Sequence, residues 1–346
     1  MKELFNMSAS PHVRSGVTTR SIMRDVVLAM LPACIFGVYR FGFNAFLILV
    51  TGAVSAMLAE FLWRKLTKKQ NTPFECSALV TGLLIAMNLP ASVPLWMPVL
   101  GSFFAILVVK EMFGGLGKNF MNPALAARCF LLICFAGRMT DFAVASAQNV
   151  FFYGTSGVDG ISSATPLAVI AGGTAGKELC GLVSLKDMFF GFTGGTIGET
   201  STAAILAGAA YLLIRKVVSL RIPVSYLAAF SVFMLIFGGY GMDSEGMYYL
   251  GCELCGGGLM LGAWFMATDY VTSPITKKGQ VVYGILLGVL TGIMRICGNS
   301  SEGVSYAIIF GNLLVPYIEK FTMPRAFGMK PAKRGSGKKE NGGAAK

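Results

Sequence analysis

Long apolar segments separated by short polar segments run along most of the chain. Several of them are interrupted by Pro or Gly. A helix needs roughly 20 apolar residues to cross the core of a bilayer, somewhat fewer when its ends are polar. The pattern therefore predicts an all-α integral membrane protein with about ten transmembrane helices, whose approximate limits are 23–40, 43–63, 76–90, 93–112, 122–137, 198–214, 222–240, 246–267, 281–297 and 303–319.

A long, weakly apolar interval over 138–197 leaves five expected helices before it and five after it. With five helices in each half, the two halves enter the membrane from opposite sides. The stretch "SALVTGLLIAMNLP" (77–90) is similar to "GGLMLGAWFMATDY" (257–270), at an offset of about 180, and each apolar run ends at a polar break. We expect two inverted five-helix repeats around a site near the midplane. Chance similarity between two apolar runs is the alternative.

The pattern divides the chain into five regions. They are a cytoplasmic N-terminal arm (1–22), a first membrane repeat (23–137), an extracytoplasmic loop (138–197), a second membrane repeat (198–319) and a basic cytoplasmic tail (320–346). The end of the tail is rich in Gly and Lys, a composition typical of disordered segments.

Charge supports this division. Only 13% of the residues are charged, against about 25% in soluble domains. The net charge of +12 is spread over short basic runs between the apolar segments, so we do not expect a nucleic-acid partner. Lys and Arg favour cytoplasmic loops. Their distribution predicts a multi-pass protein of the cytoplasmic (inner) membrane, with both termini cytoplasmic, the long loop outside and the basic tail near anionic lipid.

The stretch "DGISSAT" (159–165) lies inside the long loop. Asp-Gly favours a turn, and three hydroxyls follow within four residues, those of Ser162, Ser163 and Thr165. This arrangement suits a hydroxyl that another enzyme modifies. The alternative is an ordinary Ser/Thr turn that caps the next apolar run.

The Gly-rich stretch "GGTIGETS" (194–201) opens the sixth expected helix. Backbone N–H groups at a helix start attract anions such as a phosphate, so its candidate ligand contacts are Gly194, Gly195, Glu199 and Thr200. The alternative is a close-packing segment with Glu199 in the first helical turn, where a carboxylate complements the helix dipole.

Carboxylates inside membrane helices are costly and therefore functional candidates. They are Glu60, Glu199, Glu253 and Asp269. Asp269 has hydroxyl neighbours and suits a hard cation such as Na⁺, although a hydrated helix-end cap is an alternative. Glu60, one turn before Arg64, is expected at the membrane interface, and Arg128 is expected to pair with an acidic side chain.

Two further features bear on metal binding. Cys252 and Cys255 form a C-x-x-C at the opening of an apolar helix, without a second pair at metal spacing, so we favour buried thiols over a metal or redox site. A single histidine, His12, argues against a His-based metal site.

The motif "DGISSAT" resembles the flavinylation motif of proteins that carry FMN through a phosphoester bond to its last Thr. That residue is Thr165 here, and the motif residues before it include Asp159, Gly160, Ser162, Ser163 and Ala164. Four further segments (10–32, 114–130, 194–201 and 265–274) resemble, in the same order, the family that contains the D subunit of the Rnf complex. The resemblance covers roughly residues 8–320.

The resemblance implies a urea-transporter-like fold and a role as one electron relay. The Rnf complex passes electrons from reduced ferredoxin to NAD⁺ and couples this to Na⁺ or H⁺ export. Covalent FMN at Thr165 and a noncovalent riboflavin are the implied cofactors. The implied partners are the A, B, C, E and G subunits and a flavin transferase that acts outside the membrane. The chain has neither a dinucleotide fingerprint nor an iron–sulfur Cys array, so no complete active site is expected on it.

Two alternatives remain. The B subunit of the Na⁺-translocating NADH:quinone reductase shares the fold and the flavin Thr, but it has a larger N-terminal region than the short arm here. A transporter built on inverted repeats without a redox role would share only the fold, and a fold does not determine function.

Overall fold

The computed structural model describes residues 18–68, 76–142, 166–171, 184–239, 243–298 and 303–324. Within these residues the regular structure is helical, apart from one isolated bridge between Pro90 and Thr196. The expected all-α class is therefore confirmed for the described part of the chain.

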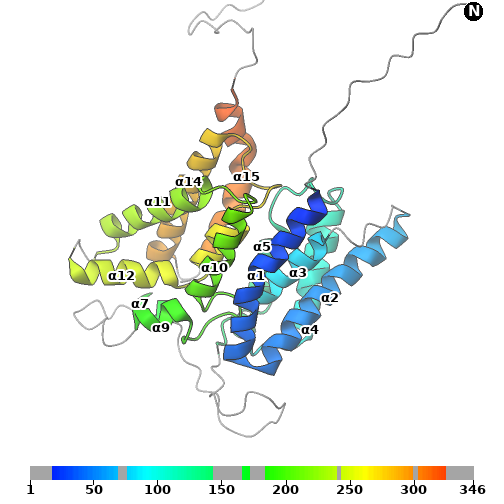
Figure 1. The fold of residues 1–346 in the computed structure, drawn as a ribbon, viewed down its shortest axis with the longest axis horizontal. Coiled ribbons are helices and arrows are strands. Elements are labelled where there is room, and N and C mark those ends of the chain that lie inside the picture. The colour runs from blue at the N-terminus through cyan, green and yellow to red at the C-terminus, as the bar shows by residue number, and fades with distance from the viewer. Residues whose placement is uncertain are drawn as a thin grey trace, which may run out of the picture.

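The helices form two groups that lie side by side in Figure 1, with α1 next to α10. The first group is α1 (Thr19–Phe41), α2 (Phe43–Leu66), α3 (Ser77–Met87), α4 (Trp96–Phe103), the π-helix η1 (Phe104–Glu111), α5 (Pro123–Cys134) and α6 (Ala136–Met139). In the sequence, the two groups are separated by two short helices, α7 (Pro166–Ala171) and α9 (Leu185–Phe190). The second group is α10 (Thr202–Ile214), α11 (Arg221–Phe237), α12 (Ser244–Cys255), α13 (Leu259–Leu261), the π-helix η2 (Gly262–Met266), α14 (Lys277–Cys297) and α15 (Val304–Thr322).

The molecule has two opposite faces. The start of α1 and the end of α15 lie at one end, at the top of Figure 1, and we call this the terminus face. The short helices α7 and α9 lie at the other end, which we call the loop face. A different cavity opens toward each face.

Several helix starts are determined locally by a polar side chain. A side-chain oxygen at the N-cap accepts a backbone N–H of the first turn at 3.0 to 3.2 Å, and the residues that do so include Thr18, Asn122, Ser201 and Thr276. Such caps stabilise a helix by about 1 kcal/mol each. At α5 the cap is followed by Pro123, whose missing N–H is not needed at that position.

Small residues bring the helices close together. Gly208 of α10 lies against the carbonyl of Ala29 of α1, so closely that a Cβ there would clash with it. Gly52 of α2 and Gly82 of α3 face each other in the same way. Small residues at such crossings allow dispersion contacts between backbones, which drive helix association in a bilayer.

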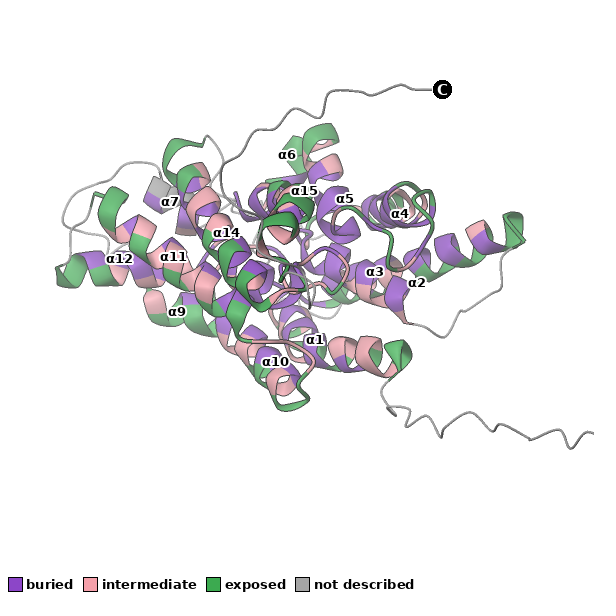
Figure 2. Ribbon diagram, turned by 90° about the horizontal axis from the view of Figure 1, so that it is seen from above, coloured by how far each residue is buried: buried purple, intermediate pink, exposed green. Residues whose placement is uncertain are grey.

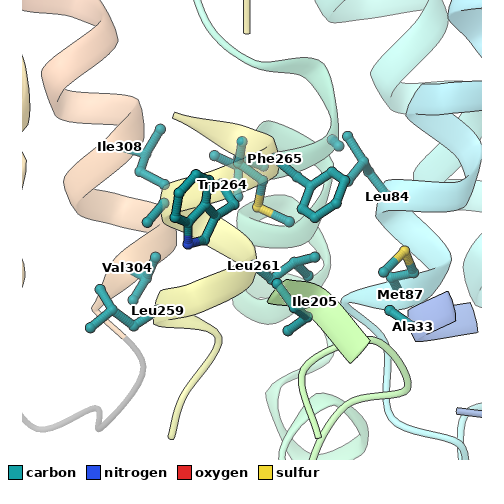
Figure 3. Close-up of a cluster of buried hydrophobic side chains, with 14 of the residues drawn as sticks. Ala33, Leu84, Met87, Ile205, Leu259, Leu261, Trp264, Phe265, Val304 and Ile308 are labelled. Carbon is teal, nitrogen blue, oxygen red and sulfur yellow. The ribbon is translucent and has the colours of Figure 1, made fainter. Parts of the chain in front are cut away.

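Buried side chains concentrate where the two groups meet, and exposed ones on the outside (Figure 2). Figure 3 shows part of this core, where Leu84 and Met87 of α3 lie opposite Phe265 of η2 and Leu261 of α13. All four side chains belong to one continuous buried cluster. This apolar centre separates the terminus face from the loop face.

Three described helices are long and apolar enough to cross a membrane, namely Thr19–Phe41, Phe43–Leu66 and Lys277–Cys297. Shorter apolar helices are Ser77–Met87, Pro123–Cys134, Thr202–Ile214 and Arg221–Phe237. The lengths and composition fit an integral membrane protein.

The expected continuous span over 246–267 is wrong. Helix α12 ends at Cys255, and the chain turns through Gly256, Gly257 and Gly258 before α13 begins. Gly257 and Gly258 have φ angles of 62° and 67°, in the left-handed region that glycine adopts without strain. Hydropathy does not register such a turn, because three glycines change the average hydrophobicity of the segment very little.

Candidate functional site

A cavity opens beside the first residue of α7, on the loop face. It is lined by Pro166, Leu167, Met188, Thr193, Gly194, Gly195, Glu199, Thr200, Cys255, Gly256 and Gly257. We call it the loop-side cavity. Its total empty volume is about 390 Å³, which includes space open to solvent. Three separate chain segments and α9 thus contribute to one site.

The flavinylation motif 159–165, with Thr165 and its five named motif neighbours, lies outside the described residues. The description resumes at Pro166, the next residue in sequence, which lines the loop-side cavity. The four candidate contact residues of the Gly-rich segment (Gly194, Gly195, Glu199 and Thr200) line the same cavity. The Gly-rich segment and the residue that directly follows the motif therefore meet at one cavity.

The Gly-rich segment is held by the end of α3. The amide of Ile197 donates to the carbonyl of Leu89 at 3.0 Å, and the amide of Gly198 donates to that of Met87 at 2.8 Å. The alternative that places Glu199 in the first turn of a helix is wrong. Ser201 caps α10, which begins only at Thr202. Glu199 precedes the cap because its segment pairs with another chain segment and cannot also be helical.

Glu199 is buried and paired with Arg128 of α5, at 3.0 Å between Nη1 and Oε1. The same Nη1 also lies 3.0 Å from Asn88 Oδ1, just after α3, and 3.0 Å from Ser305 Oγ of α15. The expected pairing of Arg128 with an acid is confirmed. This polar cluster joins both helix groups at the inner edge of the loop-side cavity.

One hydroxyl in the cavity wall has no partner. The side-chain oxygen of Thr200 is buried and makes no hydrogen bond to any described residue, although Thr200 itself is only 5% exposed. A buried hydroxyl without a partner is costly. This oxygen is therefore suited to a polar group of a ligand.

The glycine turn on the far side of the cavity is held by Arg295 of α14. Its guanidinium donates to the Glu253 carboxylate at 2.6 Å and to the carbonyl of Gly256 at 2.9 Å. Glu253, one of the embedded carboxylates, is thus part of an ion pair that positions a cavity wall. Sequence reasoning missed Arg295, although a cation near the end of an apolar helix was a signal.

The C-x-x-C pair ends a helix and does not open one, contrary to expectation. Cys252 is fully buried in the last turns of α12, and Cys255, the last residue of that helix, lines the loop-side cavity. Among the residues that the structure describes, no group of three or more His, Cys, Asp or Glu side chains could hold a metal ion.

A second, larger cavity opens between the two helix groups toward the terminus face. Its total empty volume is about 760 Å³, including space open to solvent. We call it the terminus-side cavity. Its polar lining residues are Ser77, Thr81, Lys110, Asn119, Asn122, Thr268, Asp269 and Tyr270, and its apolar ones include Met23, Val80, Leu84, Trp264 and Phe265.

Two buried polar atoms of the terminus-side cavity lack a partner among the described residues. They are the acceptor Oδ1 of Asn119 and the donor Nε1 of Trp264. A ligand that offers both a donor and an acceptor would satisfy them. Asn119 and Asn122 lie in the segment 114–130 that carried the family resemblance, but their polarity in an apolar context was not recognised as a binding signal.

A cluster of four charged side chains adjoins this cavity. Lys110 of η1 is 1% exposed, and its Nζ lies 3.2 Å from Glu60 Oε2 and 2.7 Å from Ser77 Oγ. Glu60 also pairs with Arg64 at 2.5 Å, and Arg64 lies 3.7 Å from Glu111. Glu60 is buried as the shared partner of two cations, and its expected position at the membrane interface stays a prediction.

Asp269 lines the terminus-side cavity in the turn between η2 and α14. Its Oδ2 accepts from the Thr272 hydroxyl at 3.3 Å, whereas the Thr268 hydroxyl donates to the carbonyl of Trp264. Burial raises the pKa of the Asp269 carboxyl, and hydrogen bonds from Val271 and Thr272 oppose that rise. Because the Thr268 hydroxyl is directed at the Trp264 carbonyl, the hydroxyls of Thr268 and Thr272 do not both point toward Asp269.

A family model described as the NQR2, RnfD, RnfE family matches residues 6–328. The chain is 42% identical over 337 residues to the D subunit of the Na(+)-translocating ferredoxin:NAD(+) oxidoreductase complex of Acetobacterium woodii, covering 96% of this chain and 99% of that one. It is 39% identical over 334 residues to the D subunit of the proton-translocating ferredoxin:NAD(+) oxidoreductase complex of Clostridium ljungdahlii, covering 95% and 98%. It is 34% identical over 351 residues to the D subunit of the ion-translocating oxidoreductase complex of Aliivibrio salmonicida, covering 94% and 99%. The chain therefore belongs to the NQR2, RnfD, RnfE family, with its similarity to D subunits confirming the resemblance to the Rnf complex.

Proposed function

We propose that this chain is a membrane electron carrier of an Rnf complex and holds FMN esterified through its phosphate to Thr165. It relays electrons between reduced ferredoxin and NAD⁺, and the complex couples this transfer to export of Na⁺ or H⁺. The names of the relatives support the reaction of the whole complex. The motif 159–165 and the cavity that begins at Pro166 support the flavin.

The loop-side cavity offers polar and backbone contacts to a flavin attached at the preceding residue. The Thr200 hydroxyl would meet a polar edge of the ring. Gly194 and Gly195 lack side chains, so a planar group could approach their backbone closely. Leu167 and Met188 offer apolar surface that excludes water from one side.

The chain's own residues supply position and electrostatics. When bound, FMN supplies electron transfer, the chemistry that the protein itself cannot perform. Arg128 holds Glu199 in the cavity wall, and Arg295 holds Gly256. These two ion pairs join α5 and α14 to the walls, so the site rests on the membrane helices and not on loops alone.

The terminus-side cavity is our proposed site for the noncovalent riboflavin. Its apolar walls carry Trp264 and Phe265, and its unpartnered Asn119 and Trp264 atoms provide one acceptor and one donor. Flat heterocycles with a polar edge suit cavities of this character. Two flavins on opposite faces would place relay points on both sides of the apolar core (Figure 3).

The helix positions support the proposed inverted repeats. Moving α1, α2, α3, α4–η1 and α5 forward by about 180 residues brings each onto a helix of the second group, namely α10, α11, α13–η2, α14 and α15. Helix α12 then has no counterpart among the described residues. The corresponding helices α1 and α10 contact each other, as do α5 and α15. Such pairs meet at the axis of a two-fold repeat.

The proposed topology places the terminus face in the cytoplasm and Thr165 outside. Basic residues at helix ends near the terminus face, such as Arg215, Arg221 and Lys277, support this orientation. A flavin transferase that acts outside the membrane could then reach Thr165. The A, B, C, E and G subunits would complete the electron path, and lipid would surround the exposed apolar helix surfaces.

The coupling ion stays open between Na⁺ and H⁺, because the relatives from Acetobacterium woodii and Clostridium ljungdahlii are named for different ions. Asp269 is our proposed ion-path residue, since it is a carboxylate in a cavity wall between broken helices. Its exchange for Asn should slow ion uptake in vesicles without changing the content of covalent FMN.

The observation that carries the covalent flavin is the meeting of Pro166 and the Gly-rich segment at one cavity. The purified complex, produced with its flavin transferase, should show a fluorescent band of this chain on a denaturing gel. Thr165→Ala should abolish the band and the corresponding FMN mass, and Ser163→Ala should retain both. Fluorescence that survives Thr165→Ala would show that the attachment site is wrong.

The same preparation separates the alternatives. A dark wild-type chain would favour the non-redox transporter. Copurification of a ferredoxin-binding iron–sulfur protein supports the Rnf complex, whereas quinone reduction without ferredoxin would favour the B subunit of the Na⁺-translocating NADH:quinone reductase.

A further inference from the structure

Lys110 is among the most deeply buried charged side chains in the described part of the chain. It is 1% exposed and lies in the π-helix η1, a helix type that often occurs at functional sites. Burying a cation is costly unless it is paired, and even a buried pair rarely adds stability over apolar packing. Glu60 already has a closer partner in Arg64, at 2.5 Å against 3.2 Å for Lys110. A purely structural role therefore explains Lys110 poorly.

Lys110 and its neighbour Ser77 both line the terminus-side cavity. Ser77 begins α3, and Pro123, which also lines the cavity, begins α5. The start of a helix carries the positive end of its dipole. The ammonium group and two helix starts thus meet one cavity and contribute positive charge to this part of its wall.

Other charges near this wall oppose or balance Lys110. The cluster Glu60, Arg64, Lys110 and Glu111 is neutral in sum, and among the described lining residues Asp269 contributes a carboxylate. Asp269 lies in the turn after η2, where Thr272 donates to it, and not in the Lys110 cluster. The cavity is therefore polarised, with Lys110 as its only lining cation among the described residues.

We infer that Lys110 is the counter-charge for a ligand that becomes negative when it accepts electrons. This rests on the proposed riboflavin in the same cavity. The ammonium group stabilises the reduced ring more than the oxidised ring, and so raises its affinity for electrons. Lys110 therefore acts on the flavin through its charge, and its contacts with Glu60 and Ser77 hold that charge in place.

The test is a redox titration of the purified complex, carried out in a Thr165→Ala background so that the covalent flavin does not contribute. Lys110→Met should lower the ratio of reduced to oxidised riboflavin at a given potential by about tenfold or more, as expected for one charge at an effective dielectric near 20. Lys110→Arg should restore the ratio. The exposed Lys118→Met is the matched control and should leave the ratio unchanged, because solvent screens that charge.

Riboflavin released by denaturation is measured in each sample. A wild-type complex without it would overturn both the cavity assignment and the inference. Riboflavin present in Lys110→Met with a wild-type ratio would overturn the inference alone. Should Lys110→Met fail to assemble, Lys110→Gln removes the charge and keeps a polar group beside Glu60 and Ser77, and an unchanged ratio in that variant would also overturn the inference.

Discussion

The two cavities differ in size and in the kind of wall they present. The loop-side cavity has four glycines among its eleven lining residues, whereas the terminus-side cavity has about twice the empty volume and is lined by the aromatic side chains of Trp264, Phe265 and Tyr270. A tethered ligand has already lost most of its translational freedom, so it needs few contacts to stay in place. An untethered ligand depends on buried surface and hydrogen bonds. Under the proposed function, covalent attachment would replace the contacts that the loop-side cavity lacks.

The largest expected effect comes from the polar cluster beside the loop-side cavity. Arg128→Met leaves Glu199 buried without its cation, which should cost about 3–5 kcal/mol. We expect a clear fall in the unfolding temperature of the detergent-solubilised complex, or loss of assembly. Arg128→Met with Glu199→Gln should recover much of the stability. A single variant as stable as the wild type would show that this pair does not hold the cavity.

An intermediate effect is expected in the terminus-side cavity. Asn119→Ala removes the unpartnered acceptor and should weaken riboflavin retention by about tenfold, the value of roughly one hydrogen bond. Covalent FMN should be unchanged. Measurement of both flavins after repeated washing gives the result. Equal loss of both flavins would mean that the two sites are not independent, and the comparison between the cavities would fail.

The smallest effect is expected for Thr200→Val in the loop-side cavity. It removes the partnerless hydroxyl at nearly constant volume. In the FMN-bearing protein this should cost about 1 kcal/mol and change the flavin fluorescence, while occupancy stays complete because the tether remains. In a Thr165→Ala background the same change should be neutral or slightly stabilising. Thermal unfolding of the four combinations checks this, and an identical shift in both backgrounds would argue against flavin contact.

Hydropathy predicted the helices well where one long apolar run forms one helix, as in α1, α2 and α14. It failed where the backbone turns without a change in hydrophobicity, at Gly256–Gly258. It also gave no sign of the buried pair between Lys110 and Glu60, because hydropathy has no information about a partner fifty residues earlier in the sequence.

The candidate site was partly predictable. The sequence singled out Thr165, Glu199 and Thr200 through motifs, and the structure places the described ones in one cavity. It did not identify Asn119, Trp264 or Arg295, because the first two matter through a cavity that several chain segments form, and Arg295 matters through Glu253 on another helix.

The sequence by itself determined the apolar helical class and the family, and it located the stretch 159–165 that resembles a flavinylation motif, because these depend on local composition and on short ordered motifs. Only the tertiary structure decided which embedded charges are paired and which chain segments share a cavity. The physical reason is that the free energy of a buried charge or hydroxyl depends on its partner. For Arg128 and Lys110 those partners lie on other segments, 71 and 50 residues away in the chain.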